Sequence, residues 1–222
     1  RPKQDPKVEI ENSVNYEFGG RYNQGDAKVE AIVFYNDISN LKESCSFSQG
    51  PSCDGEDTEH TAGEADVYGL EFSASYPVAL TKQLDMPMSL VYTYSDSEFK
   101  NSFESDFPMW GTIEAGDSLP YLPENQLTLN LGVIAEDWDI NLIARYVDSM
   151  LEASGEDVTL EGVSTKAHTV VDLSASYYLG SWGKVYVKAD NILDDQEIVS
   201  RRPYGARPSK PQQFFVGYQY SF

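Results

Sequence analysis

The carboxyl-terminal segment Pro211 to Phe222 limits the possible folds of this chain more than any other stretch. In an extended strand, residues two apart share a face, so one side of this segment is aromatic or branched and the other is mostly small or polar. The apolar side carries Phe214, Val216, Tyr218, Tyr220 and Phe222, and the opposite side carries Phe215, Gly217, Gln219 and Ser221. An apolar stripe with aromatic residues near its ends is typical of a membrane β-barrel. The alternative is the last strand of a soluble β-sandwich, since alternation marks any half-buried strand.

Composition excludes two classes of protein. The chain has 222 residues, and no apolar run approaches the roughly 18 to 20 residues that a membrane-spanning helix requires. Its 16 basic and 36 acidic residues give a formal net charge of -20. Binding to phosphate backbones needs clustered lysine and arginine, so we expect no nucleic-acid partner.

Alternating segments predict nine strands, most of a length that crosses a bilayer when tilted. They are Ile10 to Tyr22, Ala27 to Ser39, Asp66 to Tyr76, Met88 to Phe99, Gln126 to Ile134, Trp138 to Met150, Thr169 to Leu179, Lys184 to Ile192 and Gln212 to Phe222. The second is ambiguous, because Val29, Val33 and Tyr35 on one side and Ile32 and Phe34 on the other are all apolar. Inward-facing charges should find partners across strands or on another domain. These charges are Glu17, Arg21, Glu71, Arg145, Asp172, Lys188 and Asp190.

The connections between these strands alternate between short and long. Short or moderate links are predicted at Asn23 to Asp26, Pro77 to Pro87, Ala135 to Asp137 and Gly180 to Gly183. Long ones are predicted at Asn40 to Ala65, Lys100 to Asn125, Leu151 to His168 and Leu193 to Pro211. Tight periplasmic turns and long external loops form the pattern of an outer-membrane barrel. This pattern places the carboxyl terminus on the periplasmic side.

An odd number of strands predicts that the chain is part of a larger object. Bacterial single-chain barrels have an even strand count, and an open sheet in lipid leaves unpaired backbone groups at its edges. The first residues, RPKQDPKVEI, contain no apolar signal core, so a leader was removed or the chain starts inside a longer protein. We therefore expect residues 1–222 to be the carboxyl-terminal portion of a barrel, in one domain.

Several motifs resemble the barrel of TonB-dependent outer-membrane receptors. The resemblance covers nearly the whole chain and is most specific at VKADNILDDQ and at the terminal FFVGYQYSF; the motif SRRPYGARPSKP points to the ferric dicitrate and siderophore branch. Other matching stretches are ENSVNYEFGGRY, AIVFYNDISN, YLPENQLTLNLGV, ARYVDSM and VVDLSASYYLG.

This resemblance implies a 22-stranded barrel, of which the chain would supply the last nine strands. The family's plug domain and TonB box do not occur in the chain, and TonB-ExbB-ExbD would act through that amino-terminal region. The implied function is import of ferric chelates across the outer membrane of a Gram-negative bacterium, among outer-membrane lipid and lipopolysaccharide. The terminal Tyr218, Tyr220 and Phe222 match the signature that the barrel assembly machinery recognises. The resemblance implies no cofactor.

The last long connection holds the candidate ligand-binding residues, Arg201, Arg202 and Arg207. Its bases outnumber its acids, whereas the other external loops are mainly acidic. Arginine binds carboxylates through two parallel hydrogen bonds, which suits an anionic ferric chelate. The alternative is that these arginines pair with carboxylates of the wall or plug and only shape the loop.

Other functions have weaker support in the sequence. The acidic loops could hold Ca²⁺, but their spacing matches no defined calcium loop, so solvated acidic loops are favoured. His168 lies near Ser164 and Asp172, yet no nucleophile motif accompanies them, and we expect no enzyme activity. A passive or substrate-specific porin and a surface adhesin remain the alternatives to active import. The upstream sequence would distinguish these classes.

Cys45 and Cys53 lie eight positions apart in a stretch rich in serine, glycine and proline. A disulfide here would close a short loop and contribute about 2.5 kcal/mol in the chain-entropy model. Persistent disulfides occur in oxidising compartments such as the periplasm or the cell surface. A zinc site is the competing interpretation, but it needs two more ligands and only His60 is near.

We predict that Cys45 and Cys53 are bonded to each other. Mass spectrometry of unreduced peptides should find them in one cross-linked species, because the external loops face an oxidising environment. Reduction should loosen this loop and leave the strands intact. Two unmodified thiols in the purified protein would show that the pairing is wrong.

Overall fold

The computed structural model describes residues 10–45, 58–61, 63–104, 110–155, 164–201 and 205–220. Within these ranges the chain is almost entirely antiparallel β-structure, with one short 3-10 helix, η3, at Gly180–Trp182. No helix in the described ranges is long and apolar enough to cross a membrane. The prediction of an all-β, antiparallel fold is confirmed.

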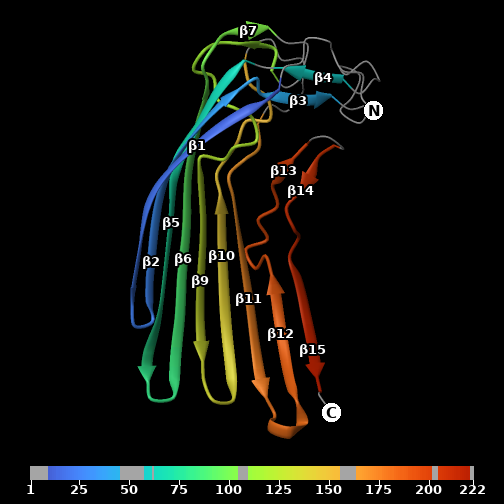
Figure 1. Ribbon diagram of the computed structural model, residues 1–222. Helices are drawn as coiled ribbons and strands as arrows, with labels where there is room; N and C mark the ends of the chain where they lie inside the picture. Colours follow the sequence, from blue (N-terminus) through green and yellow to red (C-terminus); the bar gives the residue numbers. More distant parts are fainter. Residues whose placement is uncertain are drawn as a thin grey trace.

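Nine strands form one curved sheet in which each main strand pairs with the next along the chain (Figure 1). Their bounds are β1 Asn12–Gln24, β2 Ala27–Ser39, β5 Glu64–Thr81, β6 Leu84–Phe99, β9 Asn125–Ile134, β10 Trp138–Val147, β11 His168–Tyr178, β12 Lys184–Asp190 and β15 Gln213–Gln219. These strands correspond to the nine predicted segments, and β1 and β15 form the two edges of the sheet. The turns gather at one end of the sheet and the long connections at the other, as predicted.

Three short hairpins lie within the long connections, and the sequence analysis missed them. In each, two short strands of the same connection pair antiparallel. They are β3 Lys42–Cys45 with β4 Thr58–Thr61, β7 Phe103–Glu104 with β8 Thr112–Ile113, and β13 Ile198–Ser200 with β14 Arg207–Pro208. The described parts of these long connections therefore contain three small two-stranded sheets that are separate from the main sheet.

The strand register produces one continuous apolar face. Leu90, Leu129, Ala144 and Val171 lie directly opposite one another on four successive strands, β6, β9, β10 and β11. Residues that are paired across antiparallel strands share a face of the sheet, so each such row is apolar as a whole. The apolar face is therefore a property of the sheet and not of isolated strands.

The same register resolves the ambiguity of the second predicted strand, now β2. Val29 pairs with Ala74 and Val33 pairs with Leu70, which places both valines on the apolar face. Phe34 pairs with Gly69 and therefore lies on the opposite, mostly polar face. β2 is thus apolar on both sides, since Ile32 and Phe34 lie on the otherwise polar face while Val29 and Val33 lie on the apolar face.

The last strand follows the predicted register over the residues that are described. Phe214, Val216 and Tyr218 pair with Ala189, Val187 and Val185 of β12. All three of these β15 side chains lie on the apolar face and are well exposed, Val216 at 78%. Tyr220 follows the strand and is exposed as well, while Phe222 lies outside the described residues. Their role in assembly stays a prediction.

The predicted link at Pro77 to Pro87 is wrong in its bounds. β5 runs on to Thr81 and β6 begins at Leu84, so both prolines belong to strands and face each other directly. Two opposed prolines have no N–H groups to exchange, and a strand tolerates proline where that group would point away from its partner. On the other side of Pro87, Gly132 leaves room for the ring, since a Cβ there would lie 2.9 Å from its Cγ atom.

Gly69 marks a close approach on the polar face. A Cβ atom at this position would collide with the backbone oxygen of Tyr94 and would lie 2.7 Å from the Cζ atom of Phe34. Backbone cannot rotate out of the way as a side chain can, so glycine is required here for packing. At Gly20, by contrast, an added Cβ would have no atom within 4 Å.

We expect Gly69→Ala to destabilise the barrel by about 1 to 3 kcal/mol, because overpacking must shift backbone. Gly20→Ala is the matched control, and it should change stability by no more than about 0.5 kcal/mol. The measurement is urea unfolding of the refolded, full-length protein in detergent. Equal unfolding midpoints for the two variants would contradict the packing described for Gly69.

Candidate functional site

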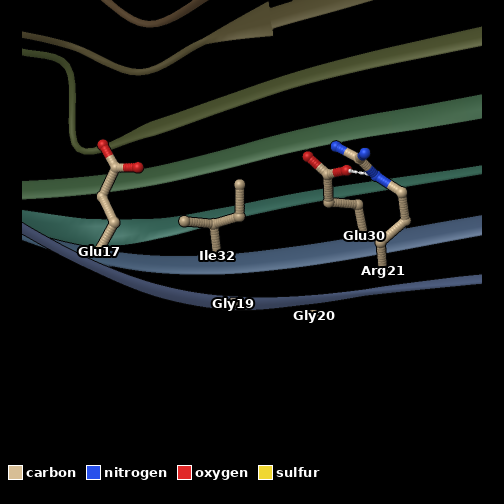
Figure 2. A pocket seen from close by; sticks show the side chains of 6 residues that line it. All are labelled: Glu17, Gly19, Gly20, Arg21, Glu30 and Ile32. Atoms are coloured by element: carbon tan, nitrogen blue, oxygen red, sulfur yellow. Dashed lines mark hydrogen bonds and ion pairs between the residues drawn. The ribbon is translucent and has the colours of Figure 1, made fainter.

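The polar face of β1 and β2 forms an open hollow lined by charged side chains (Figure 2). Glu17, Arg21, Glu30 and Ile32 project from the same side of the two strands, above the glycine pair 19–20. Arg21 and Glu30 are directly opposite each other, and the Arg21 Nε group donates a hydrogen bond to the Glu30 carboxylate. The charges of Arg21 and Glu30 therefore neutralise each other, and Glu17 leaves the hollow with one unpaired negative charge among its lining residues.

A second charged pair crosses the polar face between β10 and β11. The Nη1 atom of Arg145 lies 2.9 Å from Oδ2 of Asp172, and Oδ1 of Asp172 accepts a hydrogen bond from the backbone N–H of Asn191 at 2.9 Å. The sequence analysis expected inward charges such as Arg145 and Asp172 to find partners. The structure confirms this for both.

The last residue of β12 and the residue after it anchor the β12–β15 connection at both ends. Asp190 is fully buried, with the Nζ atom of Lys188 at 2.8 Å and the Lys210 ammonium group also bound. Asn191 is fully buried too, and its Nδ2 atom donates to the backbone oxygens of Asp195 at 3.1 Å and Lys210 at 2.7 Å. The DNILDD stretch is thus a structural junction that holds the start of the connection against its end.

Arg201 lies just after β13 and contacts the neighbouring β10–β11 connection. Its backbone N–H donates to Oε1 of Glu152 at 2.6 Å, and its Nη1 group donates to the other carboxylate oxygen. The same Nη1 group also donates to the backbone oxygen of Ser164 at 2.8 Å. Glu152 has no solvent exposure, so the carboxylate is buried beneath this arginine.

The other two candidate arginines are placed differently. Arg207 lies in β14 directly opposite Ser200, and its Nη2 group donates to the Ser200 hydroxyl at 3.1 Å. Its side chain is exposed. Arg202 lies outside the described residues. Arg207 is thus part of this short hairpin and Arg201 directly follows its first strand, and Arg201 is tied to the neighbouring connection through an ion pair with Glu152.

Tyrosine and carboxylate side chains form a belt on the apolar face, at its loop end. The Tyr68 hydroxyl donates to Oδ2 of Asp96 at 3.1 Å. Lys100 donates to Asp37 at 2.9 Å and lies near Asp66, and these contacts raise the pKa of Lys100 to about 12. Tyrosine is favoured where an apolar surface meets water. This belt was not predicted from the sequence, although tyrosines followed by carboxylates at the strand ends were a signal for it.

The remaining candidates form no site in the described part of the chain. Asp172, which the sequence places near His168 and Ser164, is bound by Arg145 and Asn191. Cys45 ends β3, whereas Cys53 lies outside the described residues. Within the described ranges, no group of three or more histidine, cysteine, aspartate or glutamate residues is arranged to hold a metal ion.

Solved structures share this arrangement of strands. The ferric-catecholate import receptor Fiu from E. coli K12 matches with a TM-score of 0.68 and 21% identity, over 96% of this chain and 28% of that one. The copper transporter OprC matches at 0.66 and 18%, over 95% and 30%. The ferric yersiniabactin uptake receptor FyuA from Yersinia pestis matches at 0.63 and 18%, over 93% and 28%. These likenesses establish the fold alone.

Curated relatives agree with the fold. Two pesticin receptors of Yersinia enterocolitica are 29% identical over 193 residues, which cover 83% of this chain. The chain spans about a quarter of the length of these relatives, 24%. The family model described as TonB dependent receptor-like, beta-barrel matches residues 2–192. A match over most of the chain, on a sheet that is apolar on one face and polar on the other, shows that this chain belongs to the TonB-dependent receptor β-barrel family.

Proposed function

We propose that this protein is an outer-membrane receptor that imports ferric chelates, and that residues 1–222 form the carboxyl-terminal part of its barrel. The observation that carries the proposal is the family match across a sheet with one apolar and one mostly polar face. A barrel in lipid needs an apolar outer surface and tolerates charge only in its interior. The paired charges of β1, β2, β10 and β11 fit an interior wall.

The named relatives support an iron chelate as cargo but do not decide it. Fiu and FyuA are described as receptors for ferric catecholates and ferric yersiniabactin, whereas OprC, with a similar TM-score, is described as a copper transporter. One fold thus serves more than one metal, and cargo depends on the site that each protein builds. We favour ferric chelates because receptors for them are the more frequent among these relatives.

The partners that we propose rest on the two faces of the sheet and on the family to which the chain belongs. The apolar face would contact outer-membrane lipid, with lipopolysaccharide around the tyrosine belt at the loop end. The polar face would surround a plug domain that precedes residue 1 and connects to TonB-ExbB-ExbD. The barrel assembly machinery would insert the strands, with Tyr218, Tyr220 and Phe222 as the assembly signature.

Uptake by the intact receptor tests this function directly. A strain that lacks its other iron receptors should take up radiolabelled iron from at least one ferric chelate of a catecholate, carboxylate and mixed-ligand panel. Uptake should stop when TonB is deleted, because a passive pore needs no energy coupling. Copper uptake without uptake of any ferric chelate would overturn the choice of cargo, and uptake that persists without TonB would indicate a porin.

The orientation of the sheet in the membrane is tested on neighbouring residues of β9. Leu129 lies on the apolar face and Asn130 on the polar face, in the middle of the same strand. Leu129→Arg should cost about 2 to 4 kcal/mol if this position lies near the bilayer midplane, because the charge would enter lipid. Asn130→Arg, at nearly the same depth, should cost much less. Reversible unfolding in lipid vesicles measures both, and equal costs would refute the orientation.

We further propose that the arginines of the β12–β15 connection contact an anionic chelate. Arg207 is exposed, and Arg201 retains 31% exposure of its side chain despite the ion pair with Glu152. Arginine recognises carboxylate and catecholate oxygens through charge-assisted hydrogen bonds. Arg201 also fixes the neighbouring connection, so it is tested by a conservative substitution that keeps its charge. Arg202 and Arg207 are tested by substitution with alanine, which removes their side chains.

The double substitution Arg202→Ala and Arg207→Ala should weaken binding of the cognate anionic chelate by about ten- to 150-fold. This range corresponds to the loss of one charge-assisted hydrogen bond. Lys82→Ala is the control, because Lys82 lies in the β5–β6 turn at the opposite end of the sheet. Isothermal titration of the purified receptor gives the affinities. Unchanged binding in both the double variant and a folded Arg201→Lys variant would leave these arginines as scaffolding.

A further inference from the structure

Glu152 is a charged residue whose burial needs an explanation. It follows β10 in the β10–β11 connection, and its side chain has no solvent exposure. A buried carboxylate is costly unless donors satisfy both of its oxygens. Here one residue supplies both donors, since the backbone N–H and the Nη1 group of Arg201 bind one oxygen each. Glu152 therefore depends on a single residue of another connection.

The Arg201 guanidinium also links the two ends of the β10–β11 connection. Leu151 and Ser164, at the start and the end of this connection, form an isolated antiparallel bridge. The Nη1 group of Arg201 donates to the Ser164 backbone oxygen at 2.8 Å and to Glu152 beside Leu151. The Nη1 atom of Arg201 thus contacts both the start and the end of this connection.

The residues on either side of Glu152 are also hydrogen-bonded to the β6–β9 connection. The Tyr121 backbone N–H donates to the oxygen of Leu151 at 2.7 Å, and the Ser154 hydroxyl donates to the backbone oxygen of Ser118. Gly155 has a positive φ of +73°, and a Cβ there would lie 2.5 Å from the backbone oxygen of Trp110. The short stretch around Glu152 is therefore packed against the β6–β9 connection and provides a firm base for Arg201.

This arrangement leaves part of the guanidinium available. Nη1 is engaged, while Nε and Nη2 of Arg201 have no hydrogen-bond partner among the described residues, and 31% of the side chain is exposed. The Nε and Nη2 groups form the edge through which arginine binds a carboxylate with two parallel hydrogen bonds. An arginine held at one end by a buried acid is thus ready to bind a second anion at its other edge.

We propose that Glu152 is a positioning residue that holds the Arg201 guanidinium ready for an anionic group of the transported ligand and so joins the β10–β11 and β12–β15 connections into one binding unit. This inference rests on the proposed import of an anionic ferric chelate. Glu152 itself does not contact the ligand. Its carboxylate fixes the direction of the guanidinium, which would otherwise lose rotamer entropy on binding.

Glu152→Gln tests the positioning role with little change in volume. The amide oxygen of glutamine accepts from only one of the two Arg201 donors at full strength, and its amino group would face the other donor. We expect affinity for a ferric tricarboxylate chelate to fall by about tenfold or more. Affinity for an uncharged ferric hydroxamate, if the receptor binds one, should stay the same. Glu152→Asp keeps the charge and should restore part of the loss.

Glu197→Gln is the matched control. Glu197 forms an exposed ion pair with Lys166 at 3.2 Å between the same two connections, and the Lys166 side chain is 77% exposed. Exposed pairs of this kind contribute little, so this variant should bind ligand as the wild type does. Hydrogen exchange of the full-length receptor without ligand supplies a second readout. Glu152→Gln should speed exchange of the Arg201 amide about tenfold, and Glu197→Gln should not.

The outcomes separate the inference from the proposed function. Wild-type receptor that binds no anionic ferric chelate refutes the proposed ligand class and the positioning role with it, whatever the exchange rates. If the wild type binds the tricarboxylate chelate and Glu152→Gln binds it equally well, Glu152 is structural and the inference is wrong. Equal losses of affinity in Glu152→Gln and Glu197→Gln would also overturn it, because simple disturbance of the loops would then account for both.

Discussion

Strand pairing in a fixed register is the constraint on which the rest of this structure depends. Each main strand from β1 to β15 pairs with its neighbours in a register that keeps apolar rows on one face. A slip by one residue at any pair would turn an entire strand over and place charges such as Arg145 and Asp172 on the apolar side. The same register therefore satisfies the backbone hydrogen bonds and keeps the apolar and polar faces apart. It also fixes the positions of the strand ends from which the connections start.

Much of the sheet was predictable, because alternation with a period of two is a local signal. The face of Val216 and the inward positions of Arg145 and Asp172 were assigned correctly from single segments. Proline misled the interpretation at Pro77 and Pro87, since its effect depends on where the missing N–H group points in the sheet. The partners at the loop end were not predictable. Glu152 and Arg201 are 49 positions apart, and nothing in the intervening sequence marks them as neighbours.

The division between sheet and connections also explains why the fold does not determine the cargo. Receptors described for ferric catecholates and for ferric yersiniabactin and a protein described as a copper transporter share this sheet at identities of 18 to 21%. The junction of Asp190, Asn191 and Lys210 holds the last connection at its two ends, so the residues between them can differ without loosening the wall. Under the proposed function, specificity would arise on loops carried by a rigid scaffold, as is common among binding proteins.

Pro77, one of the opposed prolines of β5 and β6, has a consequence for how the sheet avoids mispairing with other strands. β2 stops pairing with β5 at Ser75, so the part of β5 that extends to Thr81 has β6 on one side only. A bare strand edge invites a foreign strand to add to it. Pro77 removes a donor from this edge, and a strand that approaches from outside finds an incomplete set of hydrogen bonds. The exposed edge of β5 is thereby less open to mispairing, and the proline that obscured this strand in the sequence protects it in the folded protein.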